Sequence, residues 1–113
     1  MKSIKSDPAT TPFRISIDSH KAVLKAAHPD YDPRFNLVST IALTSPSSPR
    51  RYWLMFRRKS KINNPYYDRK NDVLYIDFSI EETSAVLQLL ESKKPANLEL
   101  KNQDGRIWVE LYV

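Results

Sequence analysis

The sequence predicts an α+β fold, in which a curved antiparallel sheet of about five strands is followed by one main helix and a C-terminal β-hairpin. Several segments alternate apolar and polar residues with the period of two that is typical of half-buried strands. Only one segment places its apolar residues at helical spacing. Because 113 residues is the size of one typical domain, we expect residues 13–113 to form a single domain and residues 1–12, which contain two prolines, to form a flexible arm.

The strands that precede the helix follow from this alternation. Residues 13–17 (FRISI) form the first strand, and residues 21–28 (KAVLKAAH) favour a second strand over a short helix. The same pattern predicts a strand at residues 35–44 and another that begins at Arg50 in the basic segment RRYWLMFRRKSK. A long loop at residues 59–72 follows, and then a strand at residues 73–78.

The helix is predicted to begin at Ser79, because Ser79 and Glu82 have the spacing of a capping box. Its apolar stripe contains Val86, Leu89 and Leu90, and Pro95 ends it. The hairpin follows, with Asp104-Gly105 as its turn. A helix packed on one face of an antiparallel sheet leaves the other face for solvent or for a partner.

The composition argues against several kinds of chemistry. The chain has no cysteine, so disulfides, zinc-thiolate sites and thiol nucleophiles are excluded. Neither His20 nor His28 has a companion at metal-ligand spacing, and a single glycine leaves no phosphate-binding glycine loop. The sequence has no secretory signal and no apolar run long enough to span a membrane, so we expect a cytoplasmic protein without membrane contact. Because the motifs above are missing, we also expect a non-catalytic protein without cofactor or metal.

The basic residues are concentrated in one part of the chain. Residues 50–70 carry eight basic residues against one acidic residue, Asp68, a local balance of +7. The remainder carries 10 basic and 12 acidic residues, a balance of −2. Such a focused charge attracts anionic partners. The alternative is a solvated strand whose charges only keep the protein soluble.

The basic strand has two different faces, because side chains alternate across a strand. Tyr52, Leu54 and Phe56 share the face expected in the core. The opposite face places Trp53 between arginines, with Tyr75 of the next strand as its expected neighbour. Trp108 and Tyr112 take the equivalent outward register of the last strand.

Cations and aromatic rings on an open sheet face suit single-stranded nucleic acid, because phosphates meet the cations and unpaired bases stack on the rings, at about 1–3 kcal/mol per base. The candidate binding residues are Arg50, Arg51, Trp53, Arg57, Arg58, Lys59, Lys61 and Tyr75. The alternative is that Trp53 and Tyr75 lie under the helix or in a subunit contact. The protein would then be an interaction or dimerisation module with an acidic partner and no nucleic-acid role.

The strand order and the segment VLYIDFSIEETSAVLQLLES resemble the single-stranded-DNA-binding transcriptional regulator fold of the Whirly and positive-cofactor proteins, including small cyanobacterial proteins of similar length. The resemblance covers residues 13–92 and is one of pattern. It implies that the sheet face binds single strands, that helices form a homodimer or larger homo-oligomer, and that the protein regulates transcription.

Overall fold

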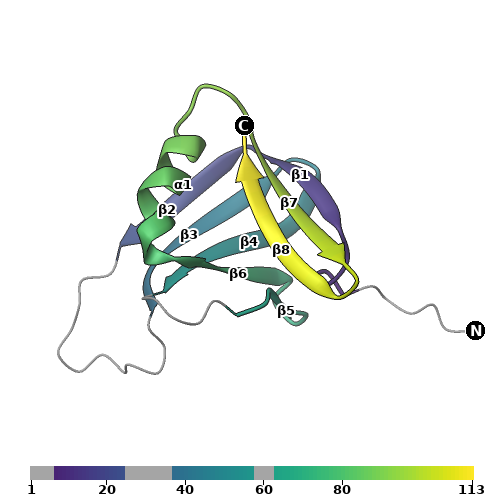
Figure 1. The fold of residues 1–113 in the computed structure, drawn as a ribbon. Coiled ribbons are helices and arrows are strands. Elements are labelled where there is room, and N and C mark those ends of the chain that lie inside the picture. The colour runs from purple at the N-terminus through teal and green to yellow at the C-terminus, as the bar shows by residue number, and fades with distance from the viewer. Residues whose placement is uncertain (1–6, 25–36, 58–62) are drawn as a thin grey trace, which may run out of the picture.

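The computed structural model describes residues 7–24, 37–57 and 63–113, with only the backbone of Val23, Leu24, Leu37 and Val38. These residues form strands, a 3-10 turn and one α-helix, so the predicted α+β class is confirmed (Figure 1). The elements are β1 (Phe13–Ile17), β2 (Ser19–Leu24), β3 (Leu37–Ser45), β4 (Ser48–Arg57), β5 (Tyr66–Asp68), β6 (Val73–Ser79), the 3-10 turn η1 (Ile80–Glu82), α1 (Thr83–Leu90), β7 (Ala96–Gln103) and β8 (Arg106–Tyr112).

The strands form two sheets, where the sequence predicted one sheet and a separate hairpin. The first has the order β1-β7-β8 and the second the order β2-β3-β4-β6-β5. The chain changes sheet at Asp18, between β1 and β2, where the Asp18 N–H donates to the Thr44 carbonyl at 3.0 Å. Apolar and polar residues alternate in the same way before and after such a bend, so the sequence pattern does not reveal the change of sheet.

The sequence predicts an antiparallel sheet, and for one pair of strands in the larger sheet this is wrong. β4 and β6 run parallel, in a register that pairs Trp53 with Tyr75. A parallel pair needs a long connection, and the segment between β4 and β6 provides one. That connection contains β5, which pairs antiparallel with β6. The sequence predicts a loop for this segment, because three residues are too few for a period of two to be recognised.

The core lies between the two sheets. Leu43, Leu54 and Phe56 from the larger sheet and Leu98 from the smaller sheet are completely buried. α1 contributes Val86 to this core, with Leu87 and Leu90 packed beside it. It lies at the side of the molecule where β6 ends (Figure 1). No helix among the described residues has both the length and the apolarity needed to cross a membrane.

The helix is shorter than predicted at both ends. Ser79 Oγ accepts a hydrogen bond from the Glu81 N–H at 3.3 Å, as a cap should, but the turn that follows is 3-10 and α1 begins at Thr83. α1 ends at Leu90 rather than near Pro95. After that point the Lys94 N–H donates to Ser92 Oγ at 3.2 Å, and such a local side-chain contact competes with helical bonding.

The C-terminal hairpin has the predicted turn. Asp104 and Gly105 have φ angles of 55° and 86°, the positive values that a type I′ turn requires. β7 and β8 pair from Gln103 and Arg106 at the turn to Asn97 and Tyr112 at the far end. At the start of the described chain, Asp7–Thr10 form a turn whose Pro8 and Ala9 are buried.

Candidate nucleic-acid interface

The basic strand divides its side chains between two faces as the sequence predicted. Tyr52, Leu54 and Phe56 of β4 point into the core and are at most 2% exposed. On the opposite face Trp53 is half-buried and Arg51 is exposed. α1 packs against the core side of the molecule, so it does not cover this outer face.

Three aromatic side chains lie in line on the outer face, across three neighbouring strands. Trp53 of β4 pairs with Tyr75 of β6, and Tyr75 pairs with Tyr66 of β5. The ring centroids are 6.3 Å apart in both contacts, and Tyr66 is 65% exposed. We call Trp53, Tyr75 and Tyr66 the aromatic row. It brings together two predicted site residues, Trp53 and Tyr75.

Tyr66 is the member of the row that sequence reasoning missed. The sequence predicts a loop at this position, and the alternation rule for strands does not say to which side a loop side chain points. The only sign in the sequence is a pair of adjacent tyrosines after Pro65 within the basic stretch. One of two adjacent strand residues must point outward, so the pair would have required a strand to be recognised first.

The row continues on its other side to a lysine. Ala42 of β3 pairs with Trp53, and Lys21 of β2 pairs with Ala42. The side chain next to the Trp53 indole on β3 is therefore only the methyl group of Ala42. Lys21 is exposed. A cation therefore lies two strands beyond Trp53, in the same transverse line as the three rings.

Arg51 is the exposed arginine among the members of the predicted set that the structure describes. It precedes Trp53 by two residues and shares its face of β4. Among the residues that the structure describes, Arg51 has no ion pair. Its guanidinium is therefore available to an anion near the aromatic row.

Arg50 has a different position and a carboxylate partner. It lies on the register of Tyr52, away from the aromatic row, and its Nε donates to Asp72 Oδ1 at 2.9 Å. Its guanidinium also lies over the Tyr67 ring, 4.9 Å from the centroid. The hydrogen bonds from Arg50 and from the Tyr67 hydroxyl hold the pKa of Asp72 below its usual range. The bond to Asp72 in turn raises the pKa of Tyr67.

Arg57 is also neutralised within the sheet. Its Nε donates to Asp77 Oδ2 at 2.8 Å, and the Asp77 side chain is only 7% exposed. The same carboxylate oxygen accepts from the backbone N–H and the side-chain amide of Asn63, both at 3.2 Å. Asp77 of β6 and Asp72, the residue before β6, both lie outside the basic stretch of residues 50–70, so a charge count along that stretch overstated its positive field.

The outer face is open on one side of the aromatic row and covered on the other. Thr40, which pairs with Met55 beyond the row, is only 4% exposed. The Trp53 indole N–H is buried and has no hydrogen-bond partner among the described residues. Access to the row is therefore greatest at Tyr66 and beside Arg51.

The remaining predicted residues divide into two groups. Arg58, Lys59 and Lys61 lie outside the described residues. Trp108 and Tyr112 have the outward register that we predicted, but on the smaller sheet, where their polar atoms donate to Glu110 and Glu99 at 2.9 Å. The two sheets enclose the core between them, so these side chains face away from the aromatic row.

The described residues contain no group of three or more histidine, cysteine, aspartate or glutamate side chains that could hold a metal ion. His20 is half-buried on β2, and His28 lies outside the described residues. Comparisons of the chain with models of protein families, with curated proteins and with solved structures find no match. The resemblance to the Whirly type of fold therefore stays a prediction, and function is inferred from the geometry of the site.

Proposed function

We propose that this protein binds single-stranded nucleic acid, without catalysis, through the aromatic row and the cations beside it. The observation that carries the proposal is the alignment of Trp53, Tyr75 and the 65%-exposed Tyr66 on adjacent strands. Aromatic rings on a sheet surface stack with unpaired bases of any sequence. A role in transcription and a homodimeric state, both implied by the resemblance, belong to this proposal.

The spacing of the rings favours a single strand over a duplex. Neighbouring centroids are 6.3 Å apart. Successive nucleotides in one strand of a duplex rise by about 3.4 Å. Bases that contact neighbouring rings must therefore separate from each other, which a flexible single strand does at low cost and a stacked duplex does not.

The electrostatic contribution is smaller than the sequence charge suggests. Of the cations that the structure describes, Lys21 and Arg51 are exposed at the row, whereas Arg50 and Arg57 already face carboxylates. Each phosphate that a single strand places on a free cation contributes about 0.7 to the slope of log affinity against log salt. We therefore expect a shallow salt dependence from these two residues, with stacking supplying much of the affinity.

The test is a fluorescence-anisotropy titration of a labelled 12-nucleotide oligo-dT at low salt. We expect Arg51→Ala to weaken binding severalfold and to reduce the salt slope by about 0.7. Arg14→Ala is the matched control, because Arg14 is an exposed arginine on the outer register of the smaller sheet. No binding at low salt, or an equal loss from both variants, would contradict the proposal.

The second candidate is an interaction module that binds an acidic protein. The exposed Tyr66 and Arg51, which share the outer face of the larger sheet, favour it, because tyrosine and arginine are enriched at protein interfaces. A defined protein partner that remains bound to the immobilised protein after nuclease treatment, together with a failed oligonucleotide titration, would support this candidate instead.

A further inference from the structure

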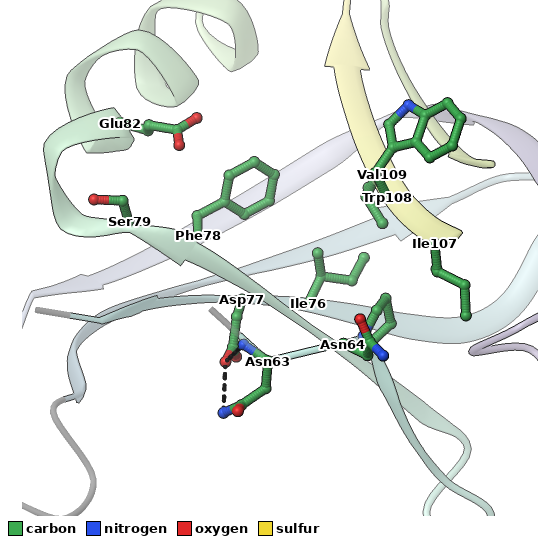
Figure 2. Close-up of a pocket in the computed structure, with 11 residues that line it drawn as sticks. Asn63, Asn64, Ile76, Asp77, Phe78, Ser79, Glu82, Ile107, Trp108 and Val109 are labelled. Carbon is green, nitrogen blue, oxygen red and sulfur yellow. Dashed lines mark hydrogen bonds between the residues drawn. The ribbon is translucent and has the colours of Figure 1, made fainter. Parts of the chain in front are cut away.

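A groove separates the two sheets between β8 and the part of β6 that β5 does not cover. Its volume is about 270 Å³. It is lined by residues of β6, of β8 and of the segment before β5, with Glu82 of η1 at one end. Figure 2 shows the side chains of Ile76 and Phe78 on one wall and those of Ile107 and Val109 on the other.

The wall formed by β8 presents unused backbone groups. Within the described residues β8 pairs with β7 alone. The type I′ turn makes Gln103 and Arg106 a hydrogen-bonded pair, and such pairs then alternate along an antiparallel ladder. The N–H and C=O groups of Ile107 and Val109 therefore point away from β7, and both residues line the groove.

The wall formed by β6 is open only beyond the part that pairs with β5. The Arg51 N–H donates to the Asp72 carbonyl at 3.2 Å, so the backbone groups of Asp72 and of every second residue after it point toward β4. The backbone groups of Asp77 and Ser79, which are on the alternate positions, therefore point away from β4. β5 covers β6 only as far as Tyr75, so Asp77 and Ser79 have no strand partner among the described residues on that side.

The side chains around these edges define a chemistry. The apolar wall residues Phe78, Ile107 and Val109 are partly exposed, although they belong to the core-facing registers of their strands. The charged residues that line the groove are both acidic, Asp77 and Glu82, and no described lysine, arginine or histidine lines it. The Asp77 carboxylate points toward Asn63, on the side of β6 opposite Phe78 (Figure 2). Asp77 is neutralised by Arg57, whereas Glu82 is exposed.

We propose that this groove binds an extended segment of a partner protein, which adds to β8 as a further strand and whose apolar and basic residues alternate. The unused groups of Ile107 and Val109 would supply main-chain hydrogen bonds, the usual source of affinity in strand addition. The volume accommodates one or two apolar side chains, and it is smaller than the roughly 300–1,000 Å³ typical of small-molecule sites. Glu82 selects a basic residue beside them. This site is separate from the aromatic row and does not depend on nucleic-acid binding.

The test uses a fluorescent seven-residue peptide of alternating lysine and valine. We expect saturable binding that protects the amides of Ile107 and Val109 from hydrogen exchange. The same peptide N-methylated on its pairing edge should bind at least about tenfold more weakly, because its backbone donors are removed. A glutamate-valine peptide should not bind.

A matched pair of variants tests the charge. Glu81 and Glu82 are adjacent, exposed and in the same turn, but only Glu82 lines the groove. We expect Glu82→Lys to weaken the lysine-valine peptide about tenfold and Glu81→Lys to leave it almost unchanged. Absence of binding, equal binding of the N-methylated peptide, or equal effects of the two variants would overturn the proposal.

Discussion

At the residue scale, the partners of the basic residues matter more than their number. Arg50 and Arg57 belong to the basic stretch of residues 50–70, yet Arg50 donates to Asp72, just before β6, and Arg57 donates to Asp77 of β6. Asp72 shows this most clearly, since it accepts from both Arg50 and the hydroxyl of Tyr67. The contact ties β4 to the β5–β6 hairpin, so Arg50 contributes to the fold rather than to a free positive surface.

Asp72→Asn should make this contact visible as a pH dependence. The folded-state pKa of Asp72 is lower than its unfolded value of about 3.9, so the carboxylate stabilises the fold above that pH and loses its contribution as pH falls through the folded pKa. Because the pair is partly exposed, we expect the variant to lose about 0.5–1 kcal/mol at pH 7. Urea unfolding from pH 7 to pH 2 should show the difference from the parent protein closing below about pH 4.

The control for this variant is Asp104→Asn. Asp104 also has a positive φ angle but has no ion pair among the described residues, so its replacement should have a small effect without this pH dependence. If the Asp72→Asn difference instead persisted unchanged to pH 2, the charge of Asp72 would not be what stabilises the contact.

At the element scale, strong local patterns were read correctly and features set by distant contacts were not. The two faces of β4 and the Asp-Gly turn follow from alternation and from turn chemistry, and both were predicted. The parallel direction of β6 was not, because alternation is identical in parallel and antiparallel strands. β5 was missed because it is three residues long, and Tyr66 was missed with it. Of the aromatic row, the sequence therefore predicted Trp53 on β4 and Tyr75 on β6, but not Tyr66, which is its most exposed ring.

Gly105→Ala tests the turn that joins β7 and β8. Gly105 has a φ angle of 86°, and an added Cβ would meet no atom within 4 Å, so the cost is conformational rather than steric. We expect a loss of about 1 kcal/mol in the free energy of unfolding, measured by chemical denaturation. Gly105→Asn should cost less, because asparagine tolerates positive φ better than alanine does. Equal stability of all three proteins would mean that the turn does not hold this conformation.

At the scale of the whole molecule, the two sheets direct two tryptophans to opposite sides. Trp53 belongs to the aromatic row of the larger sheet, and Trp108 lies on the outward register of the smaller one. The groove lies between the sheets, and its apolar wall residues, such as Phe78 and Ile107, belong to the core-facing registers. A nucleic-acid strand and a peptide segment would therefore occupy different surfaces, so each can be tested while the other stays free.

The most direct test of the central claim is to read binding from Trp53 itself. The chain has two tryptophans, so Trp108→Phe leaves Trp53 as the only one, and Trp108 belongs to the smaller sheet rather than to the aromatic row. In this variant we expect oligo-dT to quench tryptophan emission and to saturate at the same concentration as the anisotropy signal. Tyr66→Ala should weaken both signals severalfold, whereas Tyr66→Phe, which keeps the ring, should not. An anisotropy increase with unchanged Trp53 emission, or no binding at low salt, would contradict binding at the aromatic row.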